Sequence, residues 1–257
     1  MGDARDEQEA LQRLLSDVHA VLLDFDGPVT DLFKGISTKP IADEIKEAVH
    51  TIWGPLDKDV KRSTDSHGIL QDIRNMFDRP SSTPRGREAL EQAEAIVTDH
   101  ESIAARSAKP APGIVTLVNT LHEVGKRLVI VSNNAEGPVT WFLQSNGLQP
   151  QFEAVMGRDP KELRHMKPNP DCVNRAVKYL GLAPGECLLI GDQLTDLEAS
   201  NEAGTRFLGY TPSRRRPAWM WRLGSRRRAA KMRRLGADWV VSSHEPVIRA
   251  AKALVKP

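Results

Sequence analysis

The feature that most constrains the fold is an alternation of helical patterns and short apolar runs in the second half of the chain. It begins with a helical pattern over 113–124, which the β-branched run Arg127–Val131 follows. The further expected strands are Phe152–Met156, Cys187–Ile190, Thr205–Gly209 and Asp238–Val241, with helical segments such as Asp171–Leu180 between them. Because right-handed crossovers join successive parallel strands, this order predicts a three-layer α/β fold around a parallel sheet.

An earlier apolar run, Ala20–Phe25, predicts one more buried strand, and helical periodicity then dominates from about 40 to 108. One helix face is expected from Ile41, Ile45, Val49 and Ile52, a second from Ile69, Leu70, Ile73, Met76 and Phe77, and a third helix is expected to start at Ser82-Thr83-Pro84. This helical block interrupts the sheet after its first strand. We therefore expect an α/β core at 1–30 and 110–257, and a helical cap at 31–109 over the C-terminal edge of the sheet.

Two carboxylates, Asp24 and Asp26, stand at the end of the first expected strand and are followed by Gly27. One carboxylate can attack phosphorus, while a second one can protonate the leaving oxygen and later activate water. The same pattern also occurs in solvated turns and in cation-binding loops. By itself, the pair leaves catalysis and a turn equally open.

Three further polar motifs follow in order along the chain. Ser132 and Asn133 come directly after a strand and can hold a phosphoryl oxygen, and Lys167 lies in a proline-rich loop. Asp192 and Asp196 lie four residues apart after another strand and suit Mg²⁺. Taken singly, each motif also fits a helix cap, a turn or a solvated side chain. Together they meet where ligands of open α/β sheets bind, so we expect one site.

On these motifs the chain resembles the haloacid dehalogenase-like hydrolase superfamily, over about 20–241. The superfamily's four motifs match Asp24-x-Asp26-Gly27, Ser132, Lys167 and Gly191-Asp192-x-x-x-Asp196. The helical insertion is similar to the cap of the subgroup that contains phosphoglycolate phosphatase and β-phosphoglucomutase. The resemblance therefore implies a Rossmann-like α/β core with a small inserted all-helical cap.

The resemblance also implies roles for the motif residues. Asp24 would be the nucleophile that forms an aspartyl-phosphate, and Asp26 the general acid and base. Ser132 and Asn133 would bind the phosphoryl group of the substrate, and Lys167 would neutralise charge on that group and on Asp24. Phosphoryl transfer depends chiefly on such positioning and charge neutralisation.

A magnesium ion completes the implied site. Its ligands would be Asp24, the main-chain carbonyl of Asp26, and Asp192, while Asp196 would support the site through Lys167 or a bound water. The implied function is a Mg²⁺-dependent phosphatase acting on a small phosphorylated metabolite, because members that cleave carbon–halogen bonds lack the second carboxylate of motif one. A phosphomutase acting on a phosphosugar is the alternative, and the motifs do not separate the two.

The chain departs from the family pattern at Pro28, where relatives usually have Thr or Val. Proline has no amide hydrogen and a fixed φ, so we expect altered fine geometry without loss of activity. Within the expected cap, the most polar stretch contains Arg62, Ser63, Thr64, His67 and Arg74. We expect a solvated loop and helix face there, with contact between an anionic substrate and His67 or Arg74 as the alternative.

The charge of the chain is unevenly distributed: the segment 206–234 holds eleven Lys or Arg residues and no Asp or Glu, although the net charge is only +2. Its arginines, interleaved with Trp219 and Trp221, could bind nucleic acid or an acidic partner, as a binding protein of this fold would. A solvated helix is the interpretation we favour. The intact carboxylates of the four motifs also argue for an enzyme.

The sequence shows no secretory signal and no apolar run of the roughly eighteen residues that a membrane span needs. Its two cysteines, Cys172 and Cys187, are too few for a disulfide scaffold. We therefore expect a cytoplasmic protein without a membrane partner, present as a monomer or a homodimer.

Overall fold

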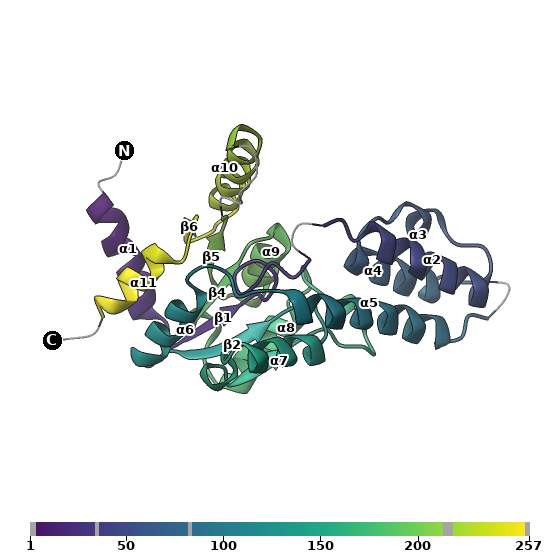
Figure 1. The fold of residues 1–257 in the computed structure, drawn as a ribbon, viewed down its shortest axis with the longest axis horizontal. Coiled ribbons are helices and arrows are strands. Elements are labelled where there is room, and N and C mark those ends of the chain that lie inside the picture. Colours follow the sequence, from purple (N-terminus) through teal and green to yellow (C-terminus); the bar gives the residue numbers. More distant parts are fainter. Residues whose placement is uncertain (1–3, 34–35, 82–83, 213–217, 255–257) are drawn as a thin grey trace.

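The computed structural model of the protein describes residues 4–33, 36–81, 84–212 and 218–254. Its centre is a six-stranded parallel sheet in the order β3-β2-β1-β4-β5-β6 (Figure 1). The strands are β1 (Ala20–Leu23), β2 (Arg127–Val131), β3 (Ala154–Met156), β4 (Cys187–Gly191), β5 (Arg206–Tyr210) and β6 (Trp239–Val241). The predicted parallel α/β fold is confirmed.

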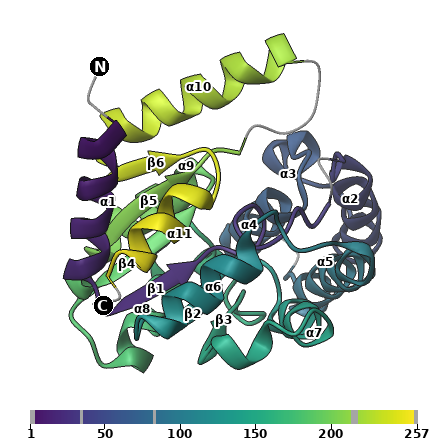
Figure 2. The ribbon, with the colours of Figure 1, turned by 60° about the vertical axis from the view of Figure 1, so that its left-hand side comes forward.

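Helices cover both faces of the sheet, as the three-layer prediction requires (Figure 2). One face is covered by α1 (Ala4–Asp17), α6 (Ile114–Glu123), α7 (Glu136–Ser145) and α11 (Glu245–Lys252). The other is covered by α8 (Asp171–Leu180), α9 (Leu194–Ala203) and the second half of α10 (Ala218–Arg234). In β1, Val21 and Leu23 join the first core cluster, whereas Ala20 and Leu22 join the second. Because successive side chains of a strand alternate between faces, a continuous apolar run is buried on both.

Four helices follow β1 and gather away from α1 and α11 (Figure 1). They are α2 (Lys39–Trp53), α3 (Lys58–Arg62), α4 (Ser66–Asp78) and α5 (Glu88–Ser107), and they share a hydrophobic cluster of their own. They fall within the predicted cap at 31–109, whose boundaries stay a prediction. The same cluster includes Leu163 and Met166, which precede Lys167 in the chain. The helical block is therefore packed against the loop that carries this lysine.

Two local expectations in the helical block were wrong. Ile52 is 39% exposed, so it does not share the buried face of α2. The third long helix, α5, begins at Glu88, although the proline signal predicted a start six residues earlier; Ser82 and Thr83 themselves lie outside the described residues. Trp53 donates a hydrogen bond from Nε1 to the carbonyl oxygen of Gly86 at 3.0 Å. This tertiary contact holds the segment before α5 outside the helix.

The basic segment contains β5 and the crossover helix α10. Ala229 and Met232 of α10 are buried against the sheet, and Arg206 of β5 pairs with Asp238 at 2.7 Å. The run 213–217 and the side chains of 218–225, which include both tryptophans, lie outside the described residues. The described part is thus a helix anchored by its apolar face, while the nucleic-acid alternative stays an untested hypothesis. Within the described ranges, no helix has both the length and the apolarity of a membrane span.

Candidate active site

The three central strands bring the motifs together at one edge of the sheet. Asp24 follows β1, Ser132 follows β2 and Asp192 follows β4, and these strands are neighbours in the order β2-β1-β4. Sheet-type hydrogen bonding continues just beyond the strands, because the N–H of Asp24 donates to the carbonyl oxygen of Ile190 at 2.9 Å. The parallel register therefore places these side chains side by side.

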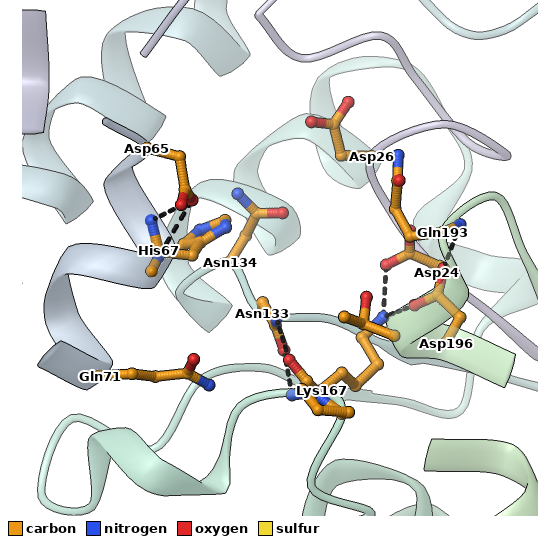
Figure 3. A pocket seen from close by; sticks show the side chains of 13 residues that line it. Asp24, Asp26, Asp65, His67, Gln71, Asn133, Asn134, Lys167, Gln193 and Asp196 are labelled. Carbon is orange, nitrogen blue, oxygen red and sulfur yellow. Dashed lines mark hydrogen bonds and ion pairs between the residues drawn. The ribbon is translucent and has the colours of Figure 1, made fainter. Parts of the chain in front are cut away.

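Lys167 is the centre of a buried ionic cluster at this edge (Figure 3). Its Nζ donates to Oδ1 of Asp24 at 2.7 Å and to the carbonyl oxygen of Val131 at 3.1 Å, and it lies 2.6 Å from Oδ1 of Asp196. The three charged side chains are all less than 10% exposed. Burial, Asp196 and Asp192 raise the pKa of Asp24 more than Lys167 lowers it. The pKa of Lys167 is raised, because the two carboxylates outweigh the effect of burial.

Three buried carboxylates converge closely enough to hold a metal ion. Asp24, Asp192 and Asp196 each offer one oxygen, and these oxygens lie within 4.8 Å of one another. Hard oxygen donors of this kind fit a divalent cation such as Mg²⁺, which would balance the excess of three carboxylates over Lys167 and Arg228, whose Nη1 lies 3.5 Å from Oδ2 of Asp192. The carboxylate of Asp26 is not one of the three, and the predicted ligand from that residue is its main-chain carbonyl.

Two glycines make this convergence possible. A Cβ at Gly27, whose φ is +128°, would lie 2.6 Å from Cγ of Asp192, and a Cβ at Gly191 would lie 2.5 Å from Cβ of Asp196. Both distances are far shorter than van der Waals contact, and L-residues disfavour positive φ. The glycines of the first and fourth motifs are therefore needed to let the acidic side chains approach.

Asp26 lines the cleft beside Asp24, and its Oδ1 accepts a hydrogen bond from the N–H of Leu32 at 2.8 Å. The turn after β1 is closed by hydrogen bonds donated from the N–H groups of Gly27, Val29 and Thr30. None of these donors is residue 28. Pro28 therefore fits the turn without loss of any of them.

Ser132 and Asn133 are positioned by local hydrogen bonds. Ser132 Oγ donates to Oδ1 of Asn134 at 3.0 Å and accepts from its N–H at 3.1 Å. Asn133 donates from Nδ2 to the carbonyl oxygen of Lys167 at 3.1 Å, and its Oδ1 accepts from the N–H of Lys167 at 2.7 Å. Asn133 thus holds the backbone that carries the lysine. A direct contact of either residue with phosphate stays a prediction.

A cleft of about 400 Å³ opens over the ionic cluster. One side is formed by the motif residues, and the opposite side by the start of α4, through Asp65, His67, Gly68 and Gln71 (Figure 3). Our expectation of a solvated helix face was therefore wrong for His67. Its Nε2 lies 2.9 Å from Oε1 of the buried Glu101, so packing against α5 keeps the ring at the cleft wall.

The expectation was also wrong for Arg74, which is only 8% exposed. Its guanidinium pairs with Asp78 at 3.1 Å and with Glu162 at 3.2 Å. Arg74 lines a separate cavity with Arg87 and contributes nothing to the wall of the cleft over Asp24. The ion pair with Glu162, in the loop after β3, and the pair with Asp78 within α4 explain its burial.

A buried network centred on Glu101 was missed altogether in the sequence. Glu101 accepts from Arg158 Nη1 at 2.8 Å, from Asn134 Nδ2 at 3.1 Å and from the N–H of Ala135 at 2.9 Å. Burial raises the pKa of Glu101, but the hydrogen bond from His67 and the charge of Arg158 lower it by more. The resulting pKa is about 2. A signal existed, because Glu101 lies four residues after the apolar Val97, on the buried face of α5.

The comparisons with known proteins agree with the site. The family model for haloacid dehalogenase-like hydrolases matches residues 17–204. Phosphoglycolate phosphatase from Rhodobacter capsulatus is 26% identical over 197 residues, which cover 77% of this chain and 86% of that protein. N-acetylmuramic acid 6-phosphate phosphatase from Pseudomonas aeruginosa is 27% identical over 193 residues, which cover 73% of this chain and 79% of that protein. Several other relatives match over less than half of their own length.

A solved structure with the same fold is that of a haloacid dehalogenase family hydrolase from Deinococcus radiodurans, with bound phosphate and sodium. It aligns with a TM-score of 0.55 at 23% identity and covers 94% of this chain and 99% of that chain. At this identity the likeness supports the fold alone. Because the family model spans most of the chain, and the four motifs converge at the edge of a parallel sheet, this chain belongs to the haloacid dehalogenase-like hydrolases.

Proposed function

We propose that the protein is a Mg²⁺-dependent phosphatase that hydrolyses a small phosphate monoester through an aspartyl-phosphate on Asp24. The observation that carries the proposal is the position of Lys167, which contacts Asp24 and Asp196 at once, at the base of the cleft. A buried lysine beside the attacking carboxylate can neutralise charge on an arriving phosphoryl group. The phosphatase names of the two relatives that match most of their length support this reading.

The proposed reaction has two steps. In the first, a carboxylate oxygen of Asp24 forms a bond to phosphorus, the ester P–O bond breaks, and Asp26 gives its proton to the leaving oxygen. In the second, Asp26 takes a proton from a water molecule, which attacks phosphorus and releases Asp24 and inorganic phosphate. The hydrogen bond from Leu32 holds Asp26 at the cleft throughout.

Asp24, Asp192 and the main-chain carbonyl of Asp26 would hold the Mg²⁺, which neutralises charge on the phosphoryl oxygens when it is bound. Asp196 supports the site through its ion pair with Lys167. Asn133 keeps this lysine in place through two hydrogen bonds to its backbone. Ser132, the residue before Asn133, would bind the phosphoryl group after its hydroxyl turns away from Asn134.

We further propose that residues 31–109 act as a cap, because the start of α4 forms the wall of the cleft that faces Asp24. A cap in this place excludes water and so strengthens the electrostatic interactions within the cleft. The substrate would be enclosed between α4 and the motif residues, and the small volume of the cleft suits a small metabolite.

The test is a screen of the purified protein with Mg²⁺ against a panel of phosphorylated metabolites, with release of inorganic phosphate as the readout. We expect turnover in the wild type and its loss in Asp24→Asn, because an amide cannot form the acyl-phosphate. A folded Asp24→Asn protein that retained the wild-type rate would contradict the proposal. An isomeric sugar phosphate formed in place of inorganic phosphate would identify a phosphomutase.

A further inference from the structure

On the basis of the proposed phosphatase function, we infer that the substrate carries an uncharged, hydroxyl-bearing leaving group, such as a polyol or a sugar. We further infer that Asp65, at the start of α4, selects it against leaving groups that carry a second anion. The inference rests on the charges and hydrogen bonds of the cleft wall that faces the ionic cluster.

The cleft has two ends with different chemistry (Figure 3). Asp24 and Lys167 lie at one end, where the phosphoryl group must bind for attack by Asp24. Asp65, His67 and Gln71 line the opposite end and come from α4. The organic part of the ester must therefore extend toward α4, where these three side chains would contact it.

The cleft has no spare cation for a second anion. Four of the side chains that line it are aspartates, Asp24, Asp26, Asp65 and Asp196, whereas Lys167 is the one Lys or Arg among the described lining residues. Lys167 is already shared between two carboxylates. A carboxylate or a second phosphate on the substrate would face Asp65 without a counter-ion, which disfavours its binding.

His67 does not supply the missing charge. Its Nε2 lies 2.9 Å from Oε1 of Glu101, and this carboxylate is ionised because its pKa is about 2. An ionised carboxylate only accepts, so the ring donates from Nε2. The Nε2 atom of the ring is therefore engaged by Glu101, and His67 brings no unpaired cation to the cleft.

Asp65 is oriented to accept hydrogen bonds from a ligand. As the N-cap of α4, it accepts from the N–H groups of His67 and Gly68, each at 3.0 Å and both at Oδ1. Among the described residues, these are the donors to this side chain, which leaves Oδ2 for the ligand. A hydroxyl can donate to this oxygen, whereas a carboxylate cannot, and the nearby Gln71 amide can both donate and accept.

The experiment compares esters that differ only in one group. The first pair is glycerol 3-phosphate and 3-phosphoglycerate, in which a hydroxymethyl group is replaced by a carboxylate. The second pair is glucitol 6-phosphate and 6-phosphogluconate, which differ in the same way. We expect kcat/KM of the wild type with Mg²⁺ to be at least about tenfold higher for the uncharged member of each pair.

Asp65→Asn is the informative variant, because asparagine is an equally good N-cap and removes only the charge and an acceptor. We expect the ratio of kcat/KM values within each pair to fall about tenfold, toward unity, while the thermal unfolding midpoint stays within about 2 °C. The matched control is Asp72→Asn on the same helix, outside the cleft lining, which should leave the ratio unchanged.

Each other outcome overturns a different statement. Equal or faster hydrolysis of the carboxylated members by the wild type overturns this inference alone, since phosphatase activity is then present. An unchanged ratio in Asp65→Asn overturns the assignment to Asp65. No phosphate release from any of the four esters or from the wider panel, by a folded protein with Mg²⁺, overturns the proposed function and this inference together.

Discussion

The protein has two buried ionic clusters near the cleft, one around Lys167 and one around Glu101. Their surroundings shift the pKa of the buried carboxyl group in opposite directions. Around Lys167, three carboxylates lie close together, Lys167 pairs with two of them and Arg228 with the third at 3.5 Å, and the pKa of Asp24 is raised. Around Glu101, one carboxylate receives hydrogen bonds from two side chains and a backbone amide as well as the ring of His67, and its pKa is lowered to about 2. Burial acts in the same direction on both acids, so the surrounding groups decide the sign.

We expect the two clusters to have different roles. The cluster at Lys167 keeps an excess of negative charge, which suits a site that completes its charge balance with a cation and a phosphoryl group. The carboxylate of Glu101 has its hydrogen-bond donors within the protein, and it joins α5 to the segments after β2 and β3 through Asn134 and Arg158. We expect changes in the first cluster to affect activity, and changes in the second to affect stability.

The largest expected effect is that of Asp24→Asn on activity. We expect kcat/KM to fall by at least about 10³-fold, because the nucleophile is lost. The free energy of unfolding without metal should not fall, since the change removes one of three neighbouring buried carboxylates. Steady-state kinetics measures the fall in kcat/KM, and urea denaturation measures the free energy of unfolding. A large loss of stability would show that this cluster is balanced in the same way as the one at Glu101.

The second effect is that of Glu101→Gln on stability. We expect the free energy of unfolding at pH 7 to fall by about 3 kcal/mol, because Arg158 would remain buried without its principal counter-ion. Urea denaturation measures this value. The matched control is Glu94→Gln, which loses a partly exposed contact with the same arginine and should cost about 1 kcal/mol or less. Equal losses in the two variants would contradict a special role for Glu101.

A third prediction concerns pH. Because the folded-state pKa of Glu101 is depressed to about 2, its contribution to stability is fully present above the unfolded-state pKa of about 4.3. It is lost as the pH falls toward 2, and the total is on the order of 3 kcal/mol. The stability difference between wild type and Glu101→Gln should therefore shrink between about pH 5 and pH 2. A difference that is independent of pH would argue against the ionised state.

The fourth and smallest effect is stabilisation by Mg²⁺. At a concentration of about 100 times its Kd, the ion should raise the free energy of unfolding by about 2.7 kcal/mol, because it binds only the folded acidic cluster. Asp192→Asn should remove most of this gain, whereas Glu101→Gln should leave it intact. Thermal denaturation with NaCl at matched ionic strength is the measurement. The same gain in wild type and Asp192→Asn would exclude Asp192 as a ligand.

The sequence alone determined the sheet and the set of motif residues. Apolar runs with β-branched residues predicted the strands, and α8 begins and ends at the predicted residues, Asp171 and Leu180. The motifs at Asp24, Ser132 and Asp192 were readable because each one directly follows a strand, so that its position in the sequence also predicts its position in the fold. Lys167 instead lies in a loop well after β3, and it was recognised through the resemblance to the family. The convergence of Asp24, Asp192 and Asp196 follows from that pattern and from the parallel strand order.

Only the tertiary structure decided the second cluster and the far wall of the cleft. Glu101 and Arg158 are 57 residues apart, and His67 is 34 residues from Glu101, so no periodicity links them. A charged side chain is by default solvated, and its burial becomes favourable only when a specific partner is brought to it. Strand positions depend on local hydrophobic patterns, which can be read from a sequence. The pairing of distant charges depends on how helices pack against each other, and the local sequence pattern does not show this packing.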